Sequence, residues 1–319
     1  MSSEKNGNGE ARRGWLKLPS VVYEIEPHFA MAARLSASPA GVCRMAAVDL
    51  PAGLVQPSPV QANIGDAKEL GHAVRSLRKS VGRRRPWALM VPDAVARVNI
   101  ISFETLPAKA AELQALLRWK IRDTLGFAPE EARLSHQVTH RGPGEIEMLV
   151  TAVKEDVRRQ YEEAVDSRND ASLMLPVTLA LLTLLPETEP GGQLLTHVCS
   201  GWVTNAVVEG NRLRFWRNRA LAGSEADGDA PQAAAAEASR AAASVRDRWG
   251  IEIRQAWCCA RPEGSDALRR CMSEALGIEA EVIVARERFS AGLRAKDKPL
   301  FQPLGAPVDA VIAATGRLR

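Results

Sequence analysis

Two histidines spaced four residues apart, His136 and His140, are the first side chains of this sequence that could do chemistry together. On a helix, that spacing would place both imidazoles on one face, where they could bind a metal ion. The segment from Leu134 to His140 alternates as a strand does, and there the two side chains would lie about 13 Å apart. We therefore expect no metal site at this position.

The five cysteines match no redox or metal-binding motif, because Cys258 and Cys259 are adjacent and not spaced as C-x-x-C. An odd number is a poor disulfide framework, so we expect reduced and mostly buried thiols, as in a cytosolic protein. The sequence also lacks the G-x-S-x-G, H-E-x-x-H and P-loop patterns. Asp93 and Asp309, near the ends of predicted elements, are the best remaining candidates for a catalytic acid.

A turn at Glu26-Pro27-His28 follows the first predicted strand, and a second strand ends near Leu35. A hairpin that cradles phosphate uses glycine, because only glycine brings backbone N–H groups close to the ligand with a positive φ. Proline has no N–H, and the acidic side chains of Glu24 and Glu26 would repel phosphate. The turn therefore argues against a phosphate-binding hairpin.

The composition is that of an ordinary globular protein, with 46% hydrophobic residues and enough chain for two lobes. The net charge of +4 is small and spread along the sequence, which argues against a nucleic-acid partner. We interpret Arg83-Arg84-Arg85 as a solvated loop, with anionic lipid or a protein partner as the alternative. The longest apolar run, Leu173 to Leu185, is too short to cross a bilayer and predicts a buried helix.

The spacing of apolar residues predicts the helices and strands in which the candidate residues lie. The clearest pattern is the stripe of leucines and Ile121 between Lys109 and Leu125, which predicts an amphipathic helix. Helices are predicted at 67–81, 109–125, 154–166, 233–248 and 266–276. Strands are predicted at 44–50, 87–91, 96–103, 134–140, 146–153, 194–208, 212–217, 251–258 and 280–284. Such alternation indicates an α/β protein.

The order of several short motifs resembles one family, the PilM-type cytoplasmic assembly proteins of type IV pili. The motifs are Ala88-Leu-Met-Val-Pro-Asp93, Leu106-Pro107, Leu116-Leu-Arg-Trp-Lys120, Gly126-Phe-Ala-Pro-Glu-Glu131, Leu149-Val-Thr-Ala-Val-Lys154, the hairpin 194–217 and the end Val308 to Arg319. Each motif is short, and the resemblance rests on their order along most of the chain. The family is related to the cytoplasmic domain of GspL of type II secretion.

The resemblance implies an actin-like (FtsA/PilM-like) two-lobed fold with an inserted small α/β subdomain and a reduced second-lobe subdomain. The implied boundaries are a disordered leader at 1–18, a first lobe at 19–98 with a return helix and linker at 169–190, an inserted subdomain at 99–168, a second lobe at 191–222 and 251–319, and a linker and helix at 223–250. The N-terminal leader is polar and lacks the apolar core of a secretion signal.

The resemblance also indicates where this chain departs from an ATP-binding relative. The first phosphate turn of the family carries Asp-x-Gly, whereas this sequence has Glu24-Ile-Glu-Pro-His28, and the second turn corresponds to His197-Val-Cys199. Both lack the Asp that would hold the water shell of Mg²⁺ and the first Gly. The stretch from Leu221 to Trp249 is shorter than the subdomain that closes over adenine. We therefore expect a degenerate site at which ATP hydrolysis is lost and ATP binding is weak or absent, and we expect no cofactor unless this interpretation of the turns is wrong, in which case ATP and Mg²⁺ would bind.

The implied function is a non-catalytic scaffold of a pilus or type II secretion-like platform, peripheral to the inner face of the bacterial inner membrane. Its implied partner is the cytoplasmic tail of a single-pass, PilN-like membrane protein, with a motor ATPase or platform protein and a second copy of the chain as further partners. We predict docking at Arg118, Trp119, Arg122 and Phe127, since a Trp and an Arg at the edge of a subdomain make good anchors, with packing of Trp119 against its own sheet as the alternative. The alternatives are an actin-like ATPase or kinase with atypical phosphate loops, a filament-forming actin relative, and an unrelated scaffold.

Overall fold

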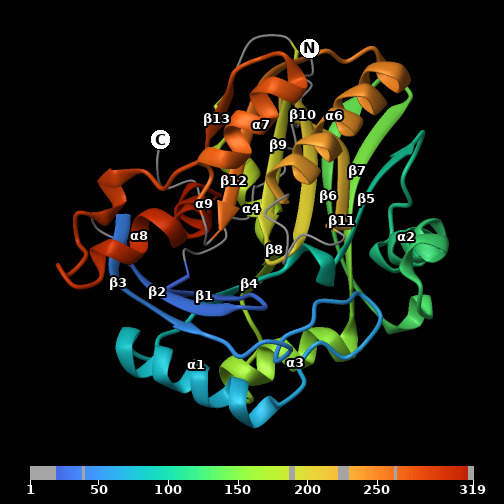
Figure 1. Ribbon diagram of the computed structural model, residues 1–319. Coiled ribbons are helices and arrows are strands. Elements are labelled where there is room, and N and C mark those ends of the chain that lie inside the picture. Colours follow the sequence, from blue (N-terminus) through green and yellow to red (C-terminus); the bar gives the residue numbers. More distant parts are fainter. Residues whose placement is uncertain (1–18, 38–39, 187–190, 222–229, 262–263, 315–319) are drawn as a thin grey trace, which may run out of the picture.

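The computed structural model describes residues 19–37, 40–186, 191–221, 230–261 and 264–314, which form three β-sheets with helices around them (Figure 1). The predicted leader at 1–18, most of the acidic linker after Leu221, and the last residues of the predicted closing helix lie outside this range. Among the described helices, none combines the length and the apolar character that crossing a bilayer requires.

The first sheet has five strands in the order β3-β2-β1-β4-β8, with parallel pairing of β1 with β4 and of β4 with β8. Its strands are β1 (Val21–Ile25), β2 (Phe29–Ala37), β3 (Ala40–Asp49), β4 (Trp87–Val91) and β8 (Leu173–Pro176). Parallel neighbours need crossover connections, and helix α1 (Ala67–Val81) makes the one between β3 and β4. Asp66 caps α1 by accepting hydrogen bonds from two backbone N–H groups of its first turn.

The second sheet repeats this topology in the order β11-β10-β9-β12-β13, again as two antiparallel pairings followed by parallel strands. Its strands are β9 (Gly192–Cys199), β10 (Trp202–Glu209), β11 (Arg212–Ala220), β12 (Ile253–Arg261) and β13 (Ala280–Val282). Helices α6 (Ala230–Trp249) and α7 (Asp266–Leu276) pack on its outer face. Two sheets of the same order therefore face each other across the molecule.

A shared apolar core joins the two lobes. It includes side chains of the first sheet, such as Met31, of the second sheet, such as Leu195, and of the helices α4 (Val177–Leu181) and α9 (Ala306–Ala314) between them. The short helix α8 (Lys298–Leu304) precedes α9 and adds Phe301 to the same core. Burial of these apolar surfaces favours a fixed arrangement of the two lobes.

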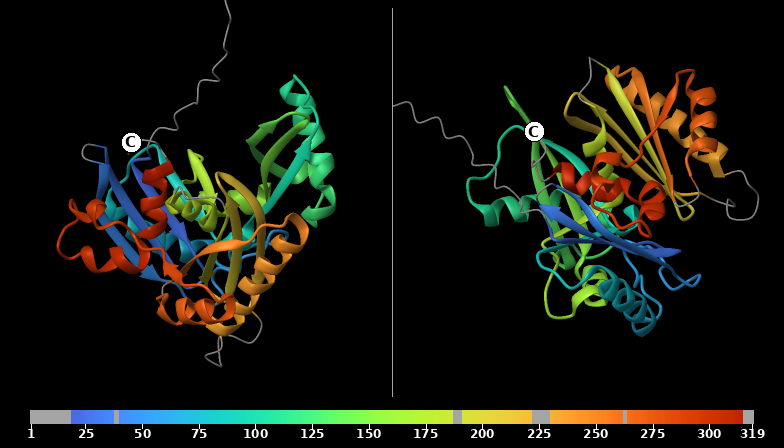
Figure 2. Two further views of the ribbon diagram at one scale, coloured as in Figure 1. Left: turned by 90° about the horizontal axis from the view of Figure 1, so that it is seen from above. Right: turned by 90° about the vertical axis from the view of Figure 1, so that its left-hand side faces the viewer.

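A third sheet, with the order β5-β7-β6, is inserted between β4 and β8 and projects from the two lobes (Figure 2). It consists of β5 (Arg97–Phe103), β6 (Ala132–Gly142) and β7 (Glu145–Lys154), covered on one face by α2 (Ala110–Leu125), and α3 (Glu155–Asp166) leads back to the first lobe. Leu117, Ile121 and Leu125, spaced four apart, pack on this sheet, and Gly126 ends α2 with φ +78°. The predicted amphipathic helix is confirmed.

The helices predicted at 67–81 and 266–276 are confirmed at those bounds, and the other three begin or end within three residues of their predicted bounds. The apolar run Leu173 to Leu185 is the main correction, because it is not one buried helix. Its first four residues form β8, which pairs with β4, and only Val177–Leu181 is α-helical before a 3₁₀ turn at Leu182–Leu184. Pro176 explains the difference, because proline is tolerated at the start of a helix but breaks a helix when it lies in the interior.

Candidate functional site

The carboxyl ends of the parallel strands of both sheets meet between the two lobes, which is where open α/β sheets place their ligands. Several polar side chains occupy this interlobe site and are buried. They are Glu24 of β1, Glu26 after it, Asp93 after β4, Thr178 at the start of α4, His197 and Cys199 of β9, and Arg261 at the end of β12. The contacts among these groups decide whether a ligand could enter.

Glu24 and Arg261 form a buried ion pair that joins the two lobes. The guanidinium nitrogens of Arg261 donate to both carboxylate oxygens of Glu24 at 2.6 and 3.1 Å, and the two side chains are 2% and 0% exposed. Burial alone would lower the pKa of Arg261, but the charge of Glu24 raises it and keeps the guanidinium protonated. The cation at the end of β12 is therefore already neutralised by the protein.

Asp93 is the centre of a hydrogen-bonded group contributed by both lobes. Its carboxylate accepts from the Thr178 backbone N–H at 2.9 Å, from the Thr204 hydroxyl at 2.7 Å and from the Thr178 hydroxyl, and the Nδ1 atom of His197 lies 3.3 Å away. Burial would raise the pKa of Asp93, but the hydrogen bonds from His197 and Thr178 hold that pKa below its ordinary value. Asp93 is thus an anion whose acceptor oxygens are already used.

Glu26 has fewer partners than Asp93: Cys199 hydrogen-bonds its carboxyl group, but the Oε1 atom is buried and forms no hydrogen bond with any described residue. Burial and the neighbouring carboxylate of Glu24 raise the pKa of Glu26 well above its ordinary value. The Nε2 atom of His197 is also buried without a partner among the described residues. Both side chains line one interlobe cavity of about 10 Å³, together with Asp93, Cys199 and Asn218. That volume is close to what a single water molecule needs.

The two turns expected at this site differ from each other. Glu26-Pro27-His28 forms the β1–β2 turn, as predicted, and the Glu26 backbone N–H donates to the Phe29 carbonyl at 2.9 Å. The β9–β10 turn lies at Ser200 and Gly201, so His197 and Cys199 both lie in β9. The turn expected at His197-Val-Cys199 and the single strand predicted at 194–208 are therefore wrong, because positive φ values at Ser200 and Gly201 reverse the chain there. Ser200 and Gly201 have φ values of +50° and +75°. Unlike the first turn, the second one therefore carries a glycine.

Asp309, the other candidate acid, does not line the interlobe cavity. It is fully buried in α9, where it accepts from the Arg286 backbone N–H at 2.8 Å and pairs with the Arg286 guanidinium. This ion pair fixes the chain before α8 onto α9, and we assign it a structural role.

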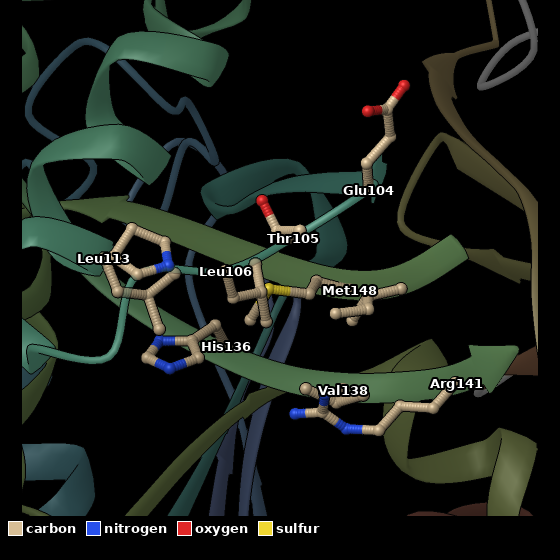
Figure 3. Close-up of a pocket in the computed structure, with 10 residues that line it drawn as sticks. Glu104, Thr105, Leu106, Leu113, His136, Val138, Arg141 and Met148 are labelled. Atoms are coloured by element: carbon tan, nitrogen blue, oxygen red, sulfur yellow. The ribbon is translucent and has the colours of Figure 1, made fainter. Parts of the chain in front are cut away.

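A second candidate site is a groove on the inserted subdomain, beside the first turn of α2 (Figure 3). Its volume is about 420 Å³, and its apolar lining comes from the β5–α2 loop, α2, β6 and β7. The lining residues are Glu104, Thr105, Leu106, Pro107, Leu113, His136, Val138, Arg141, Ile146 and Met148. The groove is thus apolar in its floor and bears Glu104, His136 and Arg141, a combination suited to a peptide segment.

None of the four residues predicted for docking lines this groove. Arg118 donates to the carbonyls of Pro129 and Ala132 at 2.5 and 2.7 Å, so it holds the start of β6 against α2. Trp119 is 56% exposed, and the Arg122 guanidinium lies 4.7 Å from its ring centroid. Phe127 is half-buried in the core of the subdomain, with the Lys154 ammonium 6.0 Å from its ring. Of the four, Trp119 and Arg122 form an exposed surface on α2.

The inserted subdomain also contacts the second lobe. Glu147 of β7 is buried and accepts from Arg212 at 2.9 Å and from Arg214 at 3.5 Å, both in β11. The hydroxyl of Thr139 adds a third donor at 3.0 Å. Burial would raise the pKa of Glu147, but Arg212 and Thr139 hold it below its ordinary value. His136, by contrast, faces the groove (Figure 3), and no described group of three or more His, Cys, Asp or Glu side chains could hold a metal ion.

Comparison with solved structures identifies the architecture. No family model matches the chain, and no curated protein does. A protein from Bacteroides thetaiotaomicron with an actin-like ATPase fold and unknown function superposes with a TM-score of 0.52 and 8% identity, over 83% of this chain and 91% of that one. The repeated sheet topology and this match define an actin-like fold.

A closer match within that class is the PilM-PilN type IV pilus biogenesis complex. It superposes with a TM-score of 0.74 and 14% identity over 93% of this chain and 98% of that chain. The expected α/β, actin-like fold is therefore confirmed, and the resemblance to PilM that the sequence motifs carry holds at the level of the fold. Identity this low describes the fold and leaves the activity to be argued from the site.

Proposed function

We propose that this protein is a non-catalytic scaffold whose interlobe site is closed by its own side chains. The observation that carries this proposal is the 10 Å³ cavity, since pockets for small molecules usually have about 300 to 1,000 Å³. A nucleotide would have to break the Glu24–Arg261 pair and displace the partners of Asp93. It would also bring phosphates close to three carboxyl groups, which repel anions unless they are protonated.

Titration of the folded protein with Mg-ATP tests this proposal. We expect no heat of binding and no rise in melting temperature, because the Arg261 guanidinium is paired with Glu24 and the cavity has room for little more than one water molecule. Binding of Mg-ATP at a functional site would raise the melting temperature measurably, since ligand at a hundred times its dissociation constant stabilises a protein by about 2.7 kcal/mol. A cooperative melting transition of the same sample shows that it is folded.

Tight binding of Mg-ATP would instead favour an actin-like ATPase, the second candidate. One observation supports it: Gly201 gives the β9–β10 turn a backbone that phosphate could approach closely. In that case the lobes would have to separate before binding, and Glu24 and Arg261 would be exposed. Adding Mg-ATP would then break the ion pair between Glu24 and Arg261, and the bound ATP would be hydrolysed.

The scaffold would act by docking the cytoplasmic tail of a single-pass membrane partner, in a type IV pilus or a related secretion platform at the inner face of the inner membrane. Two features support this part of the proposal. The first is the likeness of the fold to PilM in the PilM-PilN complex. The second is the groove beside α2, whose apolar floor would accept one or two apolar side chains of an extended segment. A motor ATPase or platform protein would bind elsewhere on the scaffold.

The substitution Val138→Glu in the groove is expected to weaken capture of a PilN-type tail peptide by about tenfold or more, because an unpaired buried charge costs at least 1 to 3 kcal/mol. Binding of the fluorescently labelled peptide measures it. Gln137→Glu is the matched control, since consecutive strand residues face opposite sides and Gln137 is exposed.

A third variant, Arg122→Glu, separates the groove from the exposed surface of Trp119 and Arg122 on α2. If only Val138→Glu weakens capture while the melting temperature is kept, the tail binds in the groove. If only Arg122→Glu does so, the α2 surface predicted from the sequence is the docking site. Unchanged capture by all three variants would exclude this subdomain.

A further inference from the structure

One end of the first lobe gathers basic side chains that neither candidate site uses. We call Arg34, Arg78, Lys79, Arg83, Arg84 and Arg85 the arginine surface. Arg78 and Lys79 lie in the last turn of α1, and Arg83 to Arg85 follow it directly. The Arg34 guanidinium lies beside Gly82, which ends α1, so strand β2 contributes to the same place. The fold thus places Arg34, which is distant in the sequence, next to the basic tract Arg83-Arg84-Arg85.

The arginine surface carries an excess of positive charge. Asp166 accepts from both Arg83 and Arg85, at 3.2 and 3.0 Å, so one carboxylate is shared by two guanidinium groups. These two arginines remain 53% and 49% exposed. Within the described part of the chain, no carboxylate lies within 4.0 Å of the charged nitrogens of the other four basic residues. Arg78 donates instead to the backbone carbonyl of Val165.

The chain also enters the first lobe beside this surface. The Ser20 backbone N–H donates to the Pro86 carbonyl at 2.6 Å, and the Ser20 hydroxyl donates to the Arg85 carbonyl at 3.1 Å. The sequence just before this point, residues 12–18, combines two arginines and a lysine with a tryptophan and two leucines. Basic residues with tryptophan and leucine are the composition that favours the interface of a bilayer.

We propose that the arginine surface binds the anionic headgroups of a phospholipid membrane. Four cations without a carboxylate partner, on one patch, match a surface of fixed negative charge better than a single small anion. Each basic side chain close to an anionic leaflet strengthens binding about fivefold, and the effect fades within a Debye length. This inference is independent of the tail-docking function, because it concerns the chain alone and a different surface.

Vesicle sedimentation of the full chain, without any partner peptide, tests the proposal. The protein is expected to bind vesicles of phosphatidylcholine with phosphatidylglycerol and not vesicles of phosphatidylcholine alone, and salt should weaken that binding. The double variant Lys79→Glu/Arg84→Glu should bind about tenfold more weakly or worse. Neither residue pairs with a described carboxylate and both are exposed, so the fold should tolerate the change.

The matched control is Arg270→Glu/Lys296→Glu, which changes the net charge equally at two exposed positions on other parts of the molecule. It should bind anionic vesicles within about twofold of the parent, since these charges lie outside the surface. Equal weakening by both double variants would overturn the proposal, because net charge would then explain binding. So would equal sedimentation with both kinds of vesicle, or equally tight binding of duplex DNA, which would indicate a general polyanion surface.

Discussion

Replacing Arg261 by methionine is expected to lower the free energy of unfolding by about 3 to 5 kcal/mol, the usual cost of breaking a buried ion pair from one side. The substitution leaves the carboxylate of Glu24 fully buried, with Glu26 as its neighbour. The two partners are 237 positions apart and belong to different lobes. Urea denaturation, followed by circular dichroism, measures the change.

Arg240→Met is the matched control, because Arg240 and Glu237 also pair at 2.6 Å but the arginine side chain is 57% exposed. We expect a loss of at most about 1 kcal/mol there, since water screens an exposed pair. The double variant Glu24→Leu/Arg261→Met should regain most of the stability, because an apolar pair removes the uncompensated charge. A single variant as stable as the parent would mean that the pair does not hold the lobes together.

The substitution Glu26→Gln is expected to stabilise the protein at pH 8 and to have little effect near pH 4.5. Burial and Glu24 raise the pKa of Glu26 in the folded state, so the folded protein keeps a proton that the unfolded chain loses. The parent therefore loses stability as the pH rises above the unfolded pKa, until the folded pKa is reached. Glutamine has the same shape and no charge, so it removes this loss.

The stability of the variant relative to the parent is expected to increase as the pH rises from 4.5 to 8, because only the parent must keep or lose this proton. Denaturation of parent and variant at a series of pH values measures it, with Glu130→Gln, at an exposed carboxyl, as the control. A difference between Glu26→Gln and the parent that stays constant with pH would contradict the protonated state of Glu26. A variant less stable than the parent at pH 8 would mean that hydrogen bonds to the Glu26 carboxyl, such as that with Cys199, outweigh the cost of burying it.

Much of the local structure could be predicted from the sequence, because local patterns determine it. The stripe from Leu113 to Leu125 has the period of a helix, and the turn at Glu26-Pro27-His28 follows from proline chemistry. The run Leu173 to Leu185 misled the prediction, since an apolar run alone does not distinguish a buried strand from a buried helix. Residues 173–176 form a strand because β8 pairs with β4, a contact that the local sequence does not reveal.

The contents of the candidate sites depend on tertiary packing. The segments, their order and the lack of a glycine in the first turn can be read from the sequence, because all of them depend on neighbours in the chain. The sequence could not place Arg261 on Glu24, or Thr204 on Asp93, because these contacts depend on the register of strands more than a hundred residues apart. The closed interlobe site and the groove beside α2 arise from that packing, so no short sequence motif predicts them.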